Sequence, residues 1–271
     1  MSLVGDKLVG VIGAGSMGGA VARGLVASGT LEASHLLVAD PDAAKRAAFE
    51  ALGARGFVDE GALLAERPDV VVFAVKPQVL PGVLEAAAAP YVDGRLVISI
   101  AAGITLCTIE GALPGARVVR AMPNMPVQTR SGASALAAGT RAPAEDLELA
   151  RELFSSIGAA CVMREDQLDV ESAVVGTAPA FFALFVDTLT RAGVAAGLPS
   201  DTCREMLLAT MRGSADQMIE EGVHPRAYLE RVTSPGGTTA AGLRALEPAL
   251  FEGSFAAVDA AMARTRELAG E

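Results

Sequence analysis

The chain has 271 residues, of which 51% are hydrophobic and 20% charged, and its formal net charge is −10. This length and apolar content suffice for one large domain or two ordinary ones with buried cores. The acidic residues are scattered, so the surface should repel nucleic acid and anionic lipid, and we expect neither nucleic acid nor a membrane as a partner.

The cysteines and histidines indicate no metal site or disulfide framework. Cys107, Cys161 and Cys203 are far apart in the sequence, and His35 and His224 are isolated. We therefore expect small buried thiols in a reducing compartment and no metal site of the His/Cys type, while carboxylate-only sites stay open. The N-terminus has no apolar signal core, and no stretch reaches membrane-spanning length without a charge or glycine, so we expect a cytoplasmic protein.

Short aliphatic runs alternate with segments of helical periodicity through about residue 165, which is typical of an α/β fold with a mostly parallel, doubly wound sheet. The predicted strands are Leu8–Ile12, Leu36–Ala39, Val70–Ala74, Leu96–Ile100, Arg117–Arg120, Ser131–Ala137 and Ala159–Met163. The predicted helices between them are Gly18–Ser28, Asp42–Leu52, Leu80–Ala89, Thr105–Leu113 and Ala144–Ser156.

After Asp166 the strand pattern stops and the remainder is all-helical. The predicted helices are Val170–Ala196, Ser200–Glu221, Pro225–Val232, Gly237–Leu246 and Phe251–Ala269. Residues 178–194 are apolar around most of the helix, which favours burial in a dimer core over the centre of a monomeric bundle. We therefore predict a dinucleotide-binding Rossmann domain over residues 1–165 and a helical substrate-binding and dimerisation domain over 166–271.

A glycine-rich GxGxxG turn joins the first predicted strand to the first predicted helix. Gly13 permits a tight turn, Gly15 lets backbone N–H groups approach a pyrophosphate, and Gly18 lets the helix pack closely on the strand. A turn without a ligand is the alternative, but the position between strand and helix favours a dinucleotide. The candidate residues are Gly13, Ala14, Gly15, Ser16, Met17 and Gly18.

An acid, Asp40, ends the second predicted strand. It is placed to accept hydrogen bonds from ribose hydroxyls, and its charge would oppose a 2′-phosphate, which favours NADH over NADPH. Lys45 and Arg46 follow within one turn of the next helix and can reach a phosphate, so both cofactors stay open. The alternative for Asp40 is a turn and cap role, because Asp40-Pro41-Asp42 also resembles a helix start.

Three further segments follow strand ends, where ligands of an open parallel sheet collect. Residues 74–77 (AVKP) leave the third strand, and residues 99–103 close the next with small side chains that leave room for a ring. Residues 120–126 form a rigid loop whose asparagine can offer amide hydrogen bonds near the nicotinamide. The candidates are Ala74, Val75, Lys76, Pro77, Ala101, Ala102 and Asn124, and a solvated loop position is an equal alternative for the lysine.

A second candidate site lies in the helical part, at residues 232–243. Ser234 can cap a helix that begins at Pro235, and the residues that follow offer bare N–H groups and two hydroxyls at a positive helix end. Such a turn is an anion cradle for a small carboxylate, although a merely well-capped helix is the alternative. The candidate substrate-binding residues are Ser234, Gly236, Gly237, Thr238 and Thr239.

Taken together, these motifs resemble those of the pyrroline-5-carboxylate reductase family over essentially the full length. The landmarks are GxGxMG at 13–18, AVKP at 74–77, RAMPN at 120–124, VGTAPAFF at 175–182 and TSPGGTTxAGL at 233–243. Thr177 stands where serine is commoner, Phe181 where tyrosine is, and Met125 where threonine is usual. Asp40 is the more consequential departure, because many members prefer NADPH and lack an acid there.

The resemblance implies hydride transfer from NADPH or NADH to the cyclic imine 1-pyrroline-5-carboxylate, which gives L-proline in the last step of proline biosynthesis. It implies that the segment from Ser234 to Thr238 holds the substrate carboxylate. It also implies that the Thr239 hydroxyl bonds the ring nitrogen and donates or relays its proton; a second cap residue is the alternative for Thr239. Finally, it implies homodimers that form through the helical domain and that sometimes assemble into larger oligomers.

Other functions stay open beside this one. A reductase of a six-membered cyclic imino acid would differ by one methylene, which changes affinity modestly. β-Hydroxyacid dehydrogenases share the two-domain plan but place a lysine on the long helix, and residues 170–196 contain no lysine. A non-catalytic dinucleotide sensor would need no anion cradle.

Overall fold

The structure is a computed structural model, and it describes residues 3–86 and 93–269. The chain divides into two compact units, one of Met1–Thr177 with Met262–Glu271 and the other of Ala178–Ala261. The functional boundary expected after residue 165 stays a prediction.

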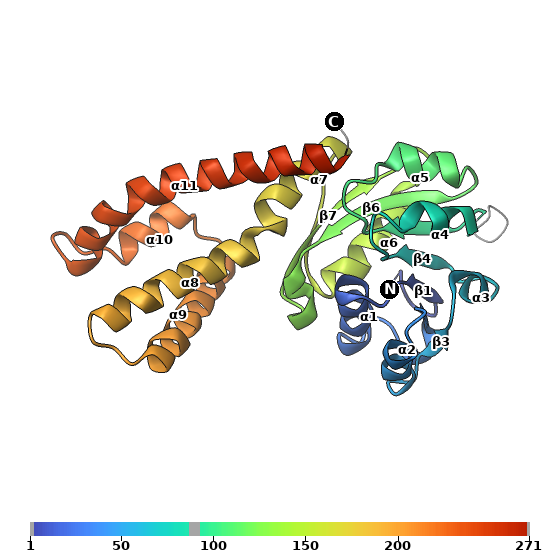
Figure 1. The fold of residues 1–271 in the computed structure, drawn as a ribbon, viewed down its shortest axis with the longest axis horizontal. Coiled ribbons are helices and arrows are strands. Elements are labelled where there is room, and N and C mark those ends of the chain that lie inside the picture. The colour runs from blue at the N-terminus through green and yellow to red at the C-terminus, as the bar shows by residue number, and fades with distance from the viewer. Residues whose placement is uncertain (1–2, 87–92, 270–271) are drawn as a thin grey trace. The chain divides into compact units, whose positions relative to one another are not determined.

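The first unit is built on one eight-stranded sheet, with the strand order β3-β2-β1-β4-β5-β6-β7-β8 (Figure 1). Every neighbouring pair is parallel except β6 and β7, which are antiparallel. The doubly wound α/β class is therefore confirmed. The strands are β1 Val9–Ile12, β2 Leu36–Ala39, β3 Arg55–Phe57, β4 Val70–Phe73, β5 Leu96–Ser99, β6 Arg117–Pro123, β7 Gly132–Ala138 and β8 Gly158–Val162.

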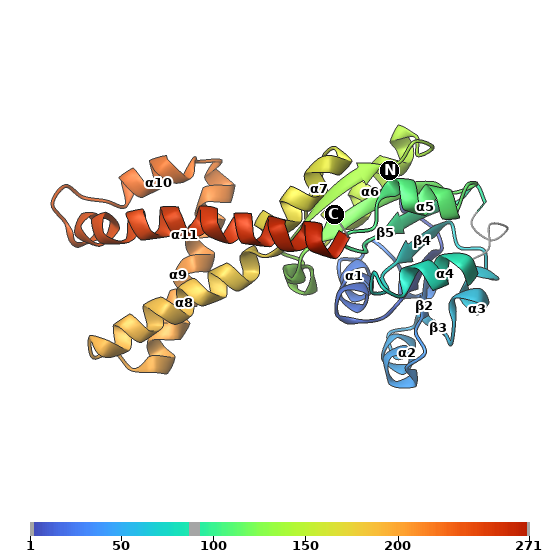
Figure 2. The same cartoon turned by 45° about the horizontal axis from the view of Figure 1, so that its top comes forward.

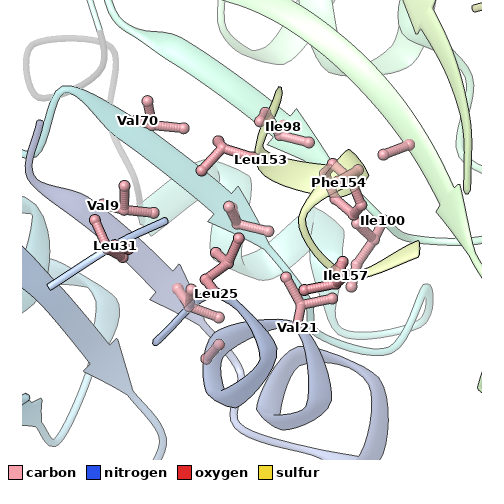
Figure 3. Close-up of a cluster of buried hydrophobic side chains, with 14 of the residues drawn as sticks. Val9, Val21, Leu25, Leu31, Val70, Ile98, Ile100, Leu153, Phe154 and Ile157 are labelled. Atoms are coloured by element: carbon pink, nitrogen blue, oxygen red, sulfur yellow. The ribbon is translucent and has the colours of Figure 1, made fainter. Parts of the chain in front are cut away.

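Helices cover both faces of this sheet, because the inner strands are aliphatic along their whole length and need cover on both sides. Buried side chains of α1 (Ser16–Ala27), α2 (Ala43–Glu50) and α6 (Ala144–Ser155) belong to one core. Those of α3 (Glu60–Leu64), α4 (Leu80–Ala86), α5 (Leu106–Ala112) and α7 (Glu165–Glu171) belong to the other. Figure 3 shows the first core, where side chains of α1 and α6 lie against β1, β4 and β5.

Three details of this unit differ from the sequence-based expectation. Strand β3 and helix α3 were not predicted, because three and five residues are too few to show a periodicity. Strand β6 continues through Met122 and Pro123, which pair with Ala135 and Ser134 of the antiparallel β7. The residues predicted to begin the loop are thus sheet. The predicted end of the helix that corresponds to α4, Ala89, lies outside the described residues.

The second unit is helical, with α8 (Ala178–Ala195), α9 (Ser200–Glu221), α10 (Pro225–Arg231) and the larger part of α11 (Thr238–Ala269) (Figure 2). The expectation of two helices after residue 237 was wrong, since α11 runs unbroken through Pro248. Leu243, Leu246, Leu250 and Ser254 line one groove from both sides of the proline. Their i, i+3, i+7 spacing keeps one helical face continuous through it.

The long helix expected at Val170–Ala196 is divided in the structure. It consists of α7, a π-helical turn at Ser172–Gly176, and α8. By length and composition alone the stretch Glu165–Ala195 could cross a membrane, with a mean hydropathy of 1.6, but a helix in the core of an assembly passes the same test. Large apolar side chains of α8 are exposed in the single chain, among them Phe182 at 58% and Leu184 at 64%.

Candidate functional site

The glycine-rich turn after β1 has the geometry that its sequence predicts. Gly13 has a φ of +100°, and a Cβ there would lie 2.8 Å from the carbonyl oxygen of Ala74. A Cβ on Gly18 would lie 2.1 Å from the Gly13 carbonyl oxygen. The protein's own packing therefore requires glycine at both positions, because α1 crosses the ends of β1 and β4 in close contact.

Gly15 is different, because nothing in the chain occupies the space that its side chain would fill. A Cβ there would meet no atom within 4 Å. Gly15 is also the N-cap of α1, no side chain caps that helix, and its first turn holds no acid. The positive end of α1 and its exposed N–H groups thus adjoin open space, which fits a phosphate group brought close to the backbone.

Other predicted cofactor residues lie at the same edge of the sheet, because the parallel strands end in register. Ile12 of β1 pairs with Ala39 of β2 and with Phe73 of β4, and Phe73 pairs with Ser99 of β5. The edge consequently carries the residues that follow these strands. They are the glycine turn with Ala14, Ser16 and Met17, then Asp40, then Ala74, Val75, Lys76 and Pro77, and then Ala101 and Ala102.

Within this group the residues differ in exposure. Ala101 is buried, whereas Ala102 and Lys76 are exposed. The backbone carbonyl of Lys76 accepts the N–H groups of Val79 and Leu80 at 2.9 and 3.1 Å, in the turn that leads into helix α4. Its side chain remains in solvent beside the edge. The order of the strands reverses between β1 and β4, which is where open α/β sheets bind their ligands.

Asp40 is buried and its carboxylate is fully engaged within the protein. Oδ2 accepts the Ala14 N–H at 2.9 Å, and Oδ1 accepts the Asp42 N–H at 3.0 Å. The Lys45 ammonium lies 3.1 Å from Oδ2 and 3.3 Å from Oδ1. Burial alone would raise the pKa of Asp40, but these backbone hydrogen bonds and Lys45 outweigh it and lower the pKa. The carboxylate is therefore charged, and it ties β2 to the glycine turn.

Asn124 lies at the end of β6, but its side chain is committed to the protein rather than turned outward. Its Oδ1 accepts the Ala133 N–H at 2.8 Å, and its Nδ2 donates to the carbonyl of Val175 at 3.2 Å. The residue four positions after Val175 is Pro179, which has no N–H with which to make an α-helical bond to this carbonyl. The amide that was expected to face the nicotinamide instead supports the π-helical turn.

Three charged residues near this turn were not among the predicted site residues, namely Arg120, Glu165 and Glu171. Arg120 is 2% exposed and donates to Glu165 over 2.8 Å, and the same carboxylate oxygen accepts the Leu106 N–H. The pair joins β6, α5 and α7. On α7, burial raises the pKa of Glu171 to about 7, and its Oε2 has no hydrogen-bond partner among the described residues.

The second candidate site, Ser234–Thr239, belongs to the second unit, and its backbone differs from the expectation. Gly236 has a φ of +70° and the Gly237 N–H donates to the Ser234 carbonyl at 3.0 Å, so residues 234–237 form a turn. Helix α11 therefore begins at Thr238 rather than at Pro235, with Gly237 before it. A Cβ on Gly237 would lie 2.4 Å from the Ser234 Oγ.

This turn leaves part of the expected anion cradle available. The Gly237 N–H is used within the turn, contrary to the expectation that it is bare. Thr238 and Thr239 are exposed at the first two positions of α11, a helix whose first turn holds no acid. Their N–H groups and hydroxyls therefore stand at the positive end of a long helix, where a carboxylate is stabilised.

The strand order and the glycine turn define the class of protein. A 3-2-1-4-5-6 parallel order with GxGxxG between β1 and α1 is that of a dinucleotide-binding oxidoreductase with a Rossmann domain. The family model described as NADP oxidoreductase coenzyme F420-dependent matches residues 8–103. A second model, pyrroline-5-carboxylate reductase dimerisation, matches residues 165–268.

Similar proteins extend this match to the whole chain. Pyrroline-5-carboxylate reductase 3 of Mus musculus is 36% identical over 264 residues, covering 97% of this chain and 96% of the relative. Pyrroline-5-carboxylate reductase of Pisum sativum is 36% identical over 261 residues, covering 96% and 95%. The structure of the Coxiella burnetii reductase superposes with a TM-score of 0.91 at 32% identity, covering 97% and 98%.

The chain belongs to the pyrroline-5-carboxylate reductase family. It is an enzyme of the NAD(P)-dependent oxidoreductase class, as the resemblance implied. A Plasmodium falciparum pyrroline carboxylate reductase, with a TM-score of 0.84 at 27% identity over 97% of this chain and 98% of that one, has a structure with NADP bound.

Proposed function

We propose that this enzyme reduces 1-pyrroline-5-carboxylate to L-proline with a hydride from NADPH or NADH. The observation that carries the proposal is the exposed Thr238–Thr239 start of helix α11 behind the Ser234–Gly237 turn. An acidic chain without a lysine in its helical part can hold a small carboxylate there through N–H groups and hydroxyls. Membership of the family supports the same substrate.

The residues divide the work between binding and proton handling. The turn Ser234–Gly237 and the hydroxyl and N–H of Thr238 hold the substrate carboxylate. The Thr239 hydroxyl hydrogen-bonds the ring nitrogen and donates or relays the proton that the reduced amine requires. The dinucleotide supplies the hydride when bound, and the chain's contribution is to position the two reactants.

The dinucleotide is held at the carboxyl edge of the sheet in the first unit. The Gly13–Gly18 turn and the start of α1 take the pyrophosphate, which the open space at Gly15 supports. Ala74–Pro77 and Ala101–Ala102 line the same edge. Asn124 contributes by fixing the backbone between β6 and the π-helical turn, since its amide is engaged by Ala133 and Val175.

The functional form is a homodimer that works in the cytoplasm. A groove of about 820 Å³ in the second unit is lined by the apolar side chains Phe185, Leu243, Leu246, Leu250, Phe251 and Phe255. A second copy is the occupant that the match to a dimerisation model favours. Residues 166–271 thus act as the substrate-binding and dimerisation domain. All three cysteines are free, but only Cys203 is buried; Cys107 and Cys161 are exposed, contrary to the expectation of buried thiols.

The test is cofactor oxidation, followed by absorbance, with three acceptors. We expect rapid oxidation with 1-pyrroline-5-carboxylate, slower oxidation with the six-membered cyclic imino acid, and none with a simple 2-keto acid. Oxidation with the 2-keto acid alone would indicate a 2-hydroxyacid dehydrogenase, and a 3-oxo acid used in its place tests for the β-hydroxyacid type. The absence of oxidation with every acceptor, in a protein that binds the dinucleotide, would indicate a sensor.

A further inference from the structure

The contacts of Asp40 determine what this acid can do for a dinucleotide. A carboxylate has about four lone-pair positions. The backbone N–H groups of Ala14 and Asp42 occupy two of them, and the Lys45 ammonium lies within 3.3 Å of both oxygens. As long as Lys45 stays in place, Asp40 has no free position with which to accept a ribose hydroxyl.

Among the described residues, the hydrogen bonds and the ion pair of the Lys45 ammonium are with Asp40. Lys45 is the third residue of α2, where a cation is disfavoured by the helix dipole, and its side chain is 42% exposed. An exposed ammonium has three donors on a flexible stem, so it can contact a second anion nearby while it stays on Asp40. Because Asp40 follows β2 at the ligand edge of the sheet, the ammonium of Lys45 is positioned at this edge as well.

The neighbouring cation, Arg46, has a different role. Its Nη1 donates to the carbonyl oxygens of Asp40 at 2.7 Å and of Pro41 at 2.9 Å. The guanidinium thereby fixes the backbone at the end of β2 and does not contact the carboxylate. Of the two cations in this segment, Lys45 is thus the one that neutralises Asp40.

We propose that Lys45 is the residue that lets this enzyme bind NADPH although an acid follows β2. Its ammonium offsets the charge of Asp40, so that a 2′-phosphate approaching this edge does not meet an unpaired carboxylate. The inference deepens the proposed function by naming what determines its cofactor. Without Lys45 the charged Asp40 is unmasked, free to accept ribose hydroxyls and repulsive to the phosphate, so the site selects NADH.

The test is the dissociation constant of each cofactor, measured by fluorescence titration without an imine acceptor. We expect Lys45→Met to weaken NADPH binding at least about tenfold, which corresponds to about 1.4 kcal/mol. NADH binding should change by less than about threefold or become tighter. Lys45→Arg keeps the charge and should keep NADPH binding. The matched control is Lys7→Met. Lys7 precedes the N-terminal end of β1, away from the carboxyl edge of the sheet, so this change should alter neither dissociation constant.

A double variant separates the charge argument from damage to the fold. Asp40→Asn together with Lys45→Met removes both charges, and we expect it to recover NADPH binding relative to Lys45→Met alone. Equal weakening of both cofactors by Lys45→Met, or unchanged NADPH binding, would overturn the inference. Because these titrations need no substrate, a chain that showed the lysine-dependent preference but reduced no imine would refute the proposed function and keep this inference.

Discussion

The side-chain amide of Asn124 donates a hydrogen bond to the carbonyl oxygen of Val175, 51 residues further along the chain, over 3.2 Å. The bond supplies a donor that Pro179 cannot give. It therefore fixes the π-helical turn at Ser172–Gly176 against the end of β6. The hydrogen bond thus links two separate motifs, residues 120–124 with Asn124 and residues 175–182 with Pro179.

Replacement of Asn124 by alanine should destabilise the first unit. The change leaves the Ala133 N–H and the Val175 carbonyl without their side-chain partner, at a cost of roughly 1–3 kcal/mol. Urea unfolding measures this cost, with the exposed neighbour Gln128→Ala as the control. An Asn124→Ala protein as stable as the control protein would contradict the support that we assign to this amide.

Glu171 should make stability depend on pH. Burial raises its pKa to about 7 from a usual value of 4.5, so the folded protein binds the proton more tightly than the unfolded chain does. The contribution of the protonated Glu171 to the free energy of unfolding is fully present below about pH 4.5. It is lost as the pH rises through about 7. Glu171→Gln removes this dependence and should gain stability relative to the original protein between pH 5 and 8.

Unfolding midpoints at several pH values measure this effect, with the exposed Glu85→Gln as the matched control. The midpoints of Glu171→Gln and of the original protein should converge at low pH and separate at high pH. Parallel curves over the whole range would show that the carboxyl of Glu171 titrates alike in the folded and unfolded chains.

Thr239→Val should lower turnover and leave cofactor affinity intact. The valine keeps the shape of the side chain but removes the hydroxyl that handles the ring-nitrogen proton, a role typically worth about 100-fold or more in rate. Steady-state turnover and NADPH titration on the same preparation measure the two effects. Thr210→Val on α9 is the control, since its hydroxyl donates to the Met206 carbonyl of its own helix. A parallel loss of NADPH affinity would place Thr239 at the cofactor.

A charge in the apolar groove of the second unit should separate the dimer. Phe251 and Phe255 are 61% and 63% exposed, and their ring centroids lie 4.8 Å apart. Phe251→Glu would have to bury an unpaired carboxylate in the interface, which costs several kcal/mol. Light scattering after size exclusion should then report half the mass, whereas Arg151→Glu in the first unit should leave the mass unchanged. An unchanged mass for Phe251→Glu would exclude this groove as the interface.

The fold could be predicted where the physical signal is local. Buried parallel strands read as continuous aliphatic runs, so β1, β2, β4 and β5 were located to within one residue at each end. The short β3 and α3 carry too few residues for a periodicity. Pro248 breaks the sequence pattern of a helix, although the apolar face of α11 continues through it.

The places of the candidate site residues in the fold could be predicted, but the hydrogen-bond partners of their side chains could not. The pattern placed Asp40 and Asn124 at strand ends, where the structure has both. What their side chains contact depends on residues remote in the sequence, Ala14 for the first and Ala133 and Val175 for the second. Strand order and register bring these partners together. The hydrophobic periodicity of a single sequence does not show which remote residues will be in contact.

The central claim is hydride transfer to the carbon of a cyclic imine. The direct measurement supplies NADPH that carries deuterium at the transferable position, with 1-pyrroline-5-carboxylate, and records the mass of the product. We predict L-proline that is heavier by one deuterium, formed in equal amount to the cofactor oxidised. Cofactor oxidation without deuterium in proline, or no proline at all, would contradict the account.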